Sequence, residues 1–460
     1  MAFSSVGSLG TASVKETGYN LSMSPSRDVA AGQLVVIWVA WDSIYSVFAD
    51  SDGTERFSIS DYDGNIYCTL GGETDTQGFY NEGAFCGIFI SQLRSPLTTS
   101  SVITVSGEND ILKAKAMSMW EFSIASGMRW AGVDTNREAT ATIGGDPPSS
   151  TLTVDVSQEH LWLHGLGVEG PNSDTYTWDG AFTEIDADGT TGGSDTANIH
   201  IRGGWKISTD NSVTVNVSSD TADRDNTQVL TAVCEVQPQP FPTTPILDNF
   251  NRANEEPLDN GTWDTTNAAG PSSPGTRLMK LTSNQAAAGS TAAGGQFWAA
   301  SFANAVEAYV SIPTWTAGEI DVHFHTAGAS QLATLDGSGV AWKGNDPQAI
   351  GTYLDLGRSG DQGGIAHSWV VRAWVSGANG YKLGIQRTPA GFGGQGVDHA
   401  WVDLGSGWEE VSALFLGRTD QRISGLLAMA VWDSTARLDD FGGGEFIEPF
   451  IPQVYRRVFG

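Results

Sequence analysis

The run from residue 318 to 325 (GEIDVHFH) is the most enzyme-like stretch of the sequence. In an extended strand, side chains alternate between two faces, so Glu319, Asp321 and His323 are expected on one side. Neighbouring carboxyl groups can work as a general acid and a general base. Retaining hydrolysis of a glycoside needs two of them about 5 Å apart, one as nucleophile and one as proton donor.

This run resembles the catalytic strand of laminarinase-like glycoside hydrolases, in which a nucleophilic Glu, an Asp and an acid/base Glu alternate along one face. His323 and Phe324 occupy the places where the second Glu would fall, so the proton donor is missing. We therefore interpret the run as an ordinary strand with one face in solvent, and we expect no enzymatic activity. A carbohydrate-active hydrolase stays open as an alternative, and dependence of hydrolysis on Glu319 or Asp321 would reveal it.

Histidine pairs raise the question of a transition-metal site. His323 and His325 offer two nitrogens from one strand face, but a zinc site needs a third ligand that the sequence does not identify. His160 and His164 would face one another only on a helix, and the residues between them indicate a strand. We interpret all four as core or surface histidines and leave metal ligands unassigned.

Aspartate clusters raise the question of calcium, which binds several oxygen ligands. Residues 50–53 (DSDG) and 61–65 (DYDGN) are interpreted as turns, because neither supplies the twelfth-position Glu of an EF-hand. Asp248, Asp439 and Asp440 are predicted to cap backbone amides at the two ends of one domain, whose terminal segments would pair as neighbouring strands. Calcium bound by these carboxylates is the alternative, and no other cofactor is expected.

Tryptophan is frequent after residue 290, and flat aromatic faces edged by Asp, Asn and Gln are what sugar rings stack on. Tryptophans inside apolar strands are expected in the core. Trp342 stands in VAWKGND, beside turn-forming residues, and is predicted to be the better exposed. Trp342, Asn345 and Asp346 are therefore the candidate ligand-binding residues.

The composition excludes several classes of protein. The 24 Lys and Arg against 53 Asp and Glu give a net charge of −29, which argues against nucleic-acid binding because phosphate contacts need clustered basic residues. Charged residues make up only 17% of the chain while glycine is abundant, which favours an all-β protein with many turns. The 40% of hydrophobic residues suffices for a buried core, so disorder is not expected.

The sequence also bears on location. No window is long and apolar enough for a membrane span, and the N-terminus lacks the features of a secretory signal, so synthesis and folding in a cytoplasm are expected. Cys68, Cys86 and Cys234 are expected to be free and buried, because each lies in an apolar stretch. A bridge between Cys68 and Cys86 is the alternative.

The length predicts two domains. Four prolines within residues 237–245 indicate a semi-rigid linker. Residues 1–236 are predicted to form a β-sandwich and residues 246–446 a second one, followed by a tail at 447–460. An internal duplication within residues 1–236 is left open, because the order of its strand-like segments repeats. Strands are expected at 33–41, 65–70, 84–91, 101–106, 115–123, 158–169, 198–208, 213–217, 228–236, 305–312, 319–324, 351–356, 368–374, 381–386, 400–404 and 426–432; residues 286–295 are expected to be a flexible loop, and 408–416 a short helix or turn.

Residues 246–254 (ILDNFNRAN), followed by Pro257-Leu258-Asp259 and Trp263, resemble the opening of concanavalin A-like, laminin-G-type jelly-roll domains of tailed-bacteriophage virion proteins. The segments 305–312 and 438–441 (LDDF) match the same pattern. In the first domain, residues 31–36, 63–67 and 96–97 are similar to a minor-tail-type sandwich. The resemblance implies two jelly-roll-like β-sandwich domains, the second of them a lectin-like surface module.

The resemblance also implies a function: a non-enzymatic minor tail protein of a virion, made in the host bacterial cytoplasm, which contacts host glycans. Its expected partners are other virion proteins and copies of itself, as a trimer or higher oligomer. The apolar tail is predicted to dock through Phe450, Tyr455 and Phe459. The alternatives are a capsid decoration protein without a ligand, and a carbohydrate-active hydrolase or its binding module.

Overall fold

A computed structural model describes most of the chain. It describes residues 2–445 except for 17, 43–56, 75–82, 108–113, 135–137, 143–146, 148, 155–157, 172, 179–180, 193–196, 221–223, 239, 269–275, 290–292, 304, 317, 327–337, 345–351, 360–366, 376–379, 389–395, 417–423 and 433.

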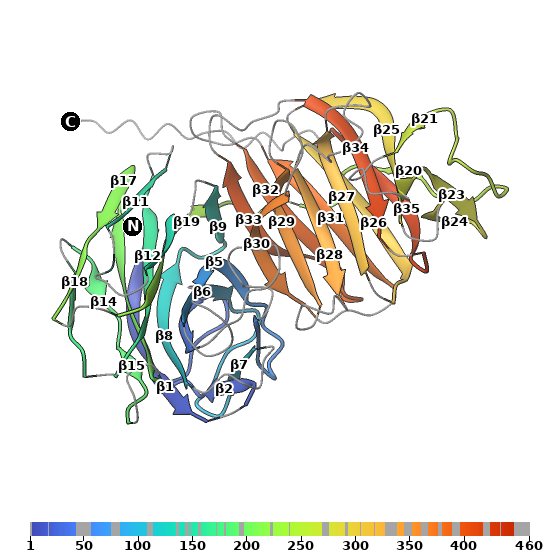
Figure 1. Cartoon of the computed structure of the whole chain (residues 1–460). Coiled ribbons are helices and arrows are strands. Elements are labelled where there is room, and N and C mark those ends of the chain that lie inside the picture. Colours follow the sequence, from blue (N-terminus) through green and yellow to red (C-terminus); the bar gives the residue numbers. More distant parts are fainter. Residues whose placement is uncertain are drawn as a thin grey trace, which may run out of the picture.

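The described residues are all-β, as predicted, and they contain no α-helix. Most strands belong to two large sheets, which we call sheet A and sheet B and which form the two layers seen in Figure 1. Every segment expected to be a strand overlaps one. The all-β prediction follows from alternating apolar residues bounded by glycine and aspartate turns, and such patterns are local.

Sheet A has 13 strands. In spatial order they are β1 (Phe3–Lys15), β8 (Ala114–Ile124), β3 (Leu34–Asp42), β6 (Ala84–Gln92), β5 (Cys68–Thr74), β30 (His367–Trp374), β29 (Tyr353–Ser359), β28 (Ser338–Gly344), β27 (Gly318–Thr326), β34 (Ser424–Val431), β25 (Ala293–Ala303) and β21 (Trp263–Ala268), with β22 (Thr276–Arg277) also paired to β25.

Sheet B has 15 strands. In spatial order they are β14 (Thr183–Glu184), β16 (Ile199–Ser208), β12 (His160–Glu169), β19 (Asn226–Val236), β9 (Arg129–Asp134), β33 (Trp408–Leu416), β32 (Val397–Asp403), β31 (Tyr381–Thr388), β26 (Val306–Thr314), β35 (Arg437–Glu445), β24 (Gln285–Ala288) and β23 (Met279–Thr282); β10 (Glu138–Thr142), β15 (Asp188–Gly189) and β20 (Ile246–Asp248) pair with β19, β16 and β35.

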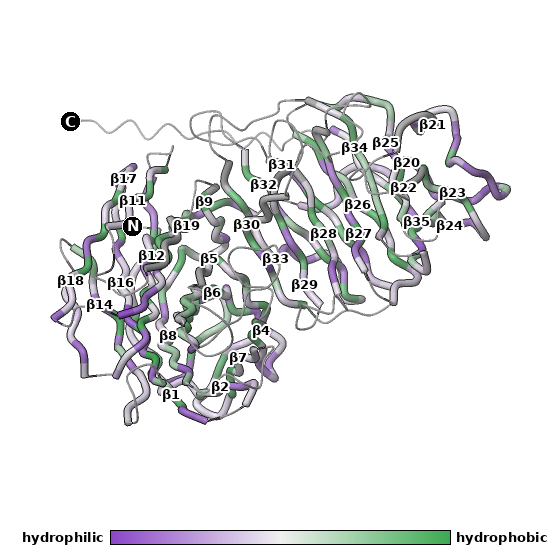
Figure 2. Tube along the Cα trace, viewed as in Figure 1, coloured by the Kyte–Doolittle hydropathy of each residue, from purple (hydrophilic) through white to green (hydrophobic). Residues whose placement is uncertain are grey.

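Three small sheets cover the outer faces of the N-terminal half, by which we mean β1–β19. One consists of β2 (Asn20–Met23), β7 (Ile103–Gly107) and β4 (Phe57–Ser60); the others pair β11 (Ser150–Thr153) with β17 (Ser212–Val215) and β13 (Tyr176–Trp178) with β18 (Val217–Ser219). Hydrophobic stretches follow the strands of the large sheets in both halves (Figure 2). Because β3 and β12 are covered on both faces, they are buried along their whole length, which explains their nearly unbroken apolar sequences.

Within the N-terminal half, the two large sheets have the same strand order. Sheet A runs β1–β8–β3–β6–β5, and sheet B runs β9–β19–β12–β16–β14. The accessory pair β2–β7 likewise has its counterpart in β11–β17. Close contact between the facing layers depends on glycine in β12, because a Cβ on Gly167 would lie 2.5 Å from the carbonyl oxygen of Phe85.

The N-terminal and C-terminal halves join edge to edge in both sheets, along a boundary that we call the seam (Figure 1). In sheet A, β30 pairs antiparallel with β5, and in sheet B, β33 pairs parallel with β9. One hydrophobic cluster continues across this boundary, with Cys68 and Trp130 on one side and Val411 on the other. The two halves therefore share a core as well as their backbone pairing.

Residues 240–245 of the proline-rich segment pack on the C-terminal half, which comprises β20–β35. Phe241 stacks on Trp401 with a centroid distance of 5.0 Å and an interplanar angle of 9°. The backbone amides of Thr243 and Thr244 donate to Glu307 Oε1 over 2.6 and 2.5 Å. These contacts fix the segment to sheet B.

Two expectations about irregular segments are wrong. Residues 408–416, expected to be a helix or turn, form β33, because its two edges pair with β32 and β9. Residues 286–295, expected to be a flexible loop, contain part of β24 and the start of β25, and Ala286 is fully buried. Small side chains serve packing here, since a Cβ on Gly294 would lie 2.7 Å from the Cα of Ala288.

The described cysteines, Cys68, Cys86 and Cys234, are free and buried, which confirms the prediction. In the part of the chain that the structure describes, there is no helix with the length and hydrophobicity needed to cross a membrane.

Candidate functional site

Strand β27 places Glu319, Asp321 and His323 on one face, because the alternating residues between them point into the core. That face is not in solvent, however. Asp321 and His323 are each only 1% exposed, so the expectation of a wet strand face is wrong. The indole N–H of Trp432 donates to Asp321 Oδ2 over 2.9 Å.

The carboxylates on this face belong to a charge network of neighbouring strands. Lys343 Nζ lies 3.4 Å from Glu319 Oε1 and 3.5 Å from Asp355 Oδ2, while Arg372 Nε donates to Asp355 Oδ1 over 2.8 Å. Burial raises the pKa of Asp321 well above its usual value, and the negative charge of Glu319 raises it further. Burial alone would lower the pKa of Lys343, but Glu319 and Asp355 raise it above its usual value. The ammonium of Lys343 lies between two carboxylates of this network, so its charge is compensated within the network.

The sequence-predicted ligand residues do not form a described site. Trp342 is 1% exposed, so the expectation of an exposed ring is wrong. In β28 it occupies a position that faces the core, where its ring lies 6.1 Å from that of Trp315 and 5.7 Å from that of Tyr381. Asn345 and Asp346 lie outside the described residues, and so do the predicted docking residues Phe450, Tyr455 and Phe459.

Asp248 has the predicted structural role. It accepts hydrogen bonds from the backbone amide of Phe250, from Arg252 Nη1 and from Trp263 Nε1 over 2.8, 2.7 and 2.7 Å. Strand β20 pairs with β35, and both Phe250 and Phe441 are fully buried. The interpretation as a cap at paired chain ends is confirmed.

The other acidic clusters have similar geometry. Asp440 N donates to Asp439 Oδ1 over 2.9 Å. In the 61–65 segment, Asp61 Oδ1 accepts from the amides of Asp63 and Asn65, which confirms a turn. Residues 50–53 are outside the described part of the chain. Among the described residues, no group of three or more His, Cys, Asp and Glu side chains is placed to hold a metal ion.

An open pocket with a volume of about 340 Å³ lies at the seam. Trp401 and Trp408 supply aromatic rings, and Phe241 packs against both of them. Trp408 is half-buried, whereas Trp401 is nearly covered. The pocket is lined by Arg129, Pro238, Trp401, Ser406, Gly407, Trp408, Glu409 and Glu410.

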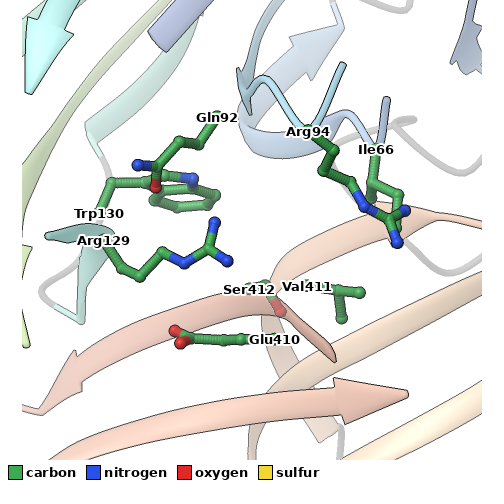
Figure 3. Close-up of a pocket in the computed structure, with 8 residues that line it drawn as sticks. All are labelled: Ile66, Gln92, Arg94, Arg129, Trp130, Glu410, Val411 and Ser412. Carbon is green, nitrogen blue, oxygen red and sulfur yellow. The ribbon is translucent and has the colours of Figure 1, made fainter. Parts of the chain in front are cut away.

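A smaller cavity of about 20 Å³ shares Arg129 and Glu410 with the open pocket. Figure 3 shows the two arginines of the N-terminal half, Arg94 and Arg129, reaching toward β33, which carries Glu410 and Ser412. Arg94 forms an ion pair with Glu409 across the seam. The cavity is lined by Ile66, Gln92, Arg94, Arg129, Trp130, Glu410, Val411 and Ser412.

Glu410 is held in place from the C-terminal half. Its Oε1 lies 3.0 Å from His399 Nδ1, and His399 Nε2 lies 3.0 Å from Thr388 Oγ1. The side chain of Glu410 is 5% exposed. A fully buried imidazole fixed at both nitrogens thus orients a carboxylate at the wall of both cavities.

The sequence did not point to this site, because its residues come from distant segments. Arg129 begins β9, which pairs with the strand that carries Glu410, and Arg94 reaches the same cavity from the segment after β6 of sheet A. One local feature of the sequence could have indicated the site. Trp401 and Trp408 flank a glycine-containing turn, and two glutamates, Glu409 and Glu410, follow directly.

Comparison with known proteins gives little likeness. No family model matches the chain, and no curated protein does. Among solved structures, a legume lectin-like domain from Entamoeba histolytica matches with 10% identity and a TM-score of 0.29, over 42% of this chain and 95% of that domain.

Proposed function

We propose that this chain is a non-enzymatic glycan-binding protein and that it binds its ligand in the open pocket at the seam. The observation that supports the proposal is the combination of tryptophan rings with charged side chains around one open hollow. A sugar presents an apolar ring face that stacks on an aromatic ring, and hydroxyl groups that need polar partners at the ring edge. The pocket supplies both kinds of contact.

The size and the hydrogen-bonding capacity of the pocket also suit a sugar. A volume of about 340 Å³ is at the small end of the range for ligand pockets, which corresponds to one or two sugar rings. The buried Trp401 Nε1 has no hydrogen-bond partner among the described residues. A ligand hydroxyl could accept from it, which would remove the cost of an unpaired buried donor.

The proposal of a non-enzymatic role rests on how the carboxylates are held. Hydrolysis of a glycoside needs two carboxyl groups that flank the scissile bond. At the seam, Glu409 is paired with Arg94, and Glu410 is held by His399. On the β27 face, Asp321 and Asp355 are buried, and Lys343 lies between Glu319 and Asp355.

We further propose that the protein acts on a tailed-phage virion, as a minor tail protein that contacts host glycans together with other virion proteins and copies of itself. The support is the sequence resemblance of residues 246–263 and 438–441, whose Asp248 and Phe441 meet where β20 pairs with β35. A capsid decoration protein without a ligand is the second candidate, and it predicts unchanged adsorption of phage that carry pocket variants.

The substitution W408A is expected to lower the affinity for a host glycan at least tenfold, because it removes a half-buried aromatic side chain from the lining of the pocket. The measurement is binding of the full chain to a glycan array and to host cells, followed by calorimetric titration of the glycans that bind. The matched control is W432A on the β27 face, which should retain binding. Loss of binding in W432A but not in W408A would contradict the assignment of the pocket.

The wild-type chain is expected to release no reducing ends from host polysaccharide, and E319Q should behave in the same way. The reason is that the strand lacks a second accessible carboxyl group beside Glu319. A reducing-sugar assay with both variants over one day checks this. Hydrolysis by the wild-type chain that disappears in E319Q would refute the non-enzymatic proposal.

A further inference from the structure

The geometry of the seam points to a specificity: we propose that the pocket prefers a sugar bearing a carboxylate, a hexuronate, with Arg129 as the anchor of the acid group. This inference rests on the proposed glycan binding and adds the chemical class of the ligand. In this arrangement the sugar ring stays in the open pocket beside Trp408, and its carboxylate lies at the entrance of the small cavity.

The guanidinium group of Arg129 has no hydrogen-bond acceptor among the described residues. It is half-buried in the wall of both cavities, and its side chain makes no ion pair or hydrogen bond with any described residue. The neighbouring Arg94 is compensated by its ion pair with Glu409. The two guanidinium groups are close enough to affect each other, since burial lowers the pKa of Arg94 and the charge of Arg129 lowers it further. A ligand carboxylate on Arg129 would relieve this repulsion with a bidentate hydrogen bond.

The small cavity, in contrast, contains hydrogen-bond acceptors that lack donors. Gln92 Oε1, Glu410 Oε2 and Ser412 Oγ are buried, and none has a hydrogen-bond partner among the described residues. Buried acceptors without donors are costly, and hydroxyl groups are what a sugar has to offer them. A hexuronate carries on one ring an acceptor for Arg129 and a hydroxyl group that can enter the cavity as a donor.

The size of the cavity restricts how the ligand fits. A space of about 20 Å³ takes one water-sized group, so it can receive a substituent but not a ring. The open pocket, which shares Arg129 and Glu410, has the room for the ring.

The test is calorimetric titration of the full chain with three pairs of methyl glycosides: glucuronate and glucose, galacturonate and galactose, mannuronate and mannose. In at least one pair the acid is expected to bind at least tenfold more tightly than its neutral partner. R129Q should remove that preference and leave the affinity for the neutral sugar unchanged, and R129K should restore part of it. R437Q, the same change in β35, should retain the preference.

The outcomes separate the two proposals. If the neutral sugars bind as well as the acids, the carboxylate inference is overturned while glycan binding stands. If R129Q keeps the preference, Arg129 is not the anchor. If none of the six glycosides and no arrayed glycan binds, both proposals fail. Thermal unfolding of R129Q, together with its affinity for the neutral sugar, shows whether the variant is folded.

Discussion

Lowering the pH from 7 to 4.5 is expected to destabilise the N-terminal half strongly, because three imidazoles in β12 and β16 are buried in their neutral form. Burial lowers the pKa of His160 and of His164 from 6.5 to about 4, and that of His200 to about 3. His164 is fixed at both nitrogens: its Nδ1 accepts from Trp178 Nε1 over 3.1 Å, and its Nε2 lies 3.0 Å from Gln228 Oε1.

The direction follows from proton binding. Below pH 6.5 the unfolded chain takes up protons on these imidazoles and the folded chain does not, so stability is complete above pH 6.5 and falls as the pH approaches 4. A shift of this size is worth about 3 kcal/mol for His164. Protonation of three such histidines can offset most of a typical free energy of unfolding of about 5–15 kcal/mol. The raised pKa values of Asp321, Asp439 and Glu235 work in the opposite direction, but Asp321 and Asp439 lie in the C-terminal half.

Urea unfolding monitored by tryptophan fluorescence at pH 7.5, 6.5, 5.5 and 4.5 is the measurement. The variant H164Q should show a weaker decline over this range than the wild type, since glutamine does not titrate. H399Q, the same substitution in the C-terminal half, serves as the control for H164Q. A free energy of unfolding that stays constant from pH 7.5 to 5 would show that these histidines are not buried as neutral groups.

Residues 240–460 expressed alone are expected to aggregate or to melt at least 10 °C below the full chain. Separation exposes the edges of β30 and β33, which pair with β5 and β9 in the intact protein. Unpaired edges with apolar side chains associate with other strands. Separation also opens the shared core, where Cys68 Sγ donates to the carbonyl of Val411 over 3.2 Å.

Size-exclusion chromatography and thermal unfolding of the fragment check this expectation. The control is the full chain with a protease site in place of residues 237–239, cut after folding: the two pieces should stay together, because the seam contacts remain. A monomeric fragment with the melting temperature of the intact chain would show that the seam contributes little.

Local patterns in the sequence were sufficient for the all-β class, for the position of most strands and for the buried cysteines. They were also sufficient for the cap at Asp248, because Asp-Asn-Phe specifies its own turn and its own buried ring. These features depend on alternation and turn chemistry among residues close in the chain, and such signals do not need the rest of the fold.

Strand β27 shows what local sequence patterns do not predict. Alternation correctly assigned Glu319 and Asp321 to one face and Ile320 to the other, but it does not say what covers each face. The face was expected in solvent, and the indole of Trp432 and the ammonium of Lys343 instead lie against it. The predicted exposure of Trp342 was wrong for the same reason. The turn-forming residues beside it did not reveal that its own position faces the core.

The sequence by itself determined that this chain folds into alternating strands, and it left open which edges meet. Only the tertiary structure decided that β33 is a strand, that it lies beside β9, and that Arg129 faces Glu410 across a pocket. The physical reason is that strand pairing between segments far apart in the chain depends on edge hydrogen bonds and shared apolar burial, which every exposed strand edge can offer.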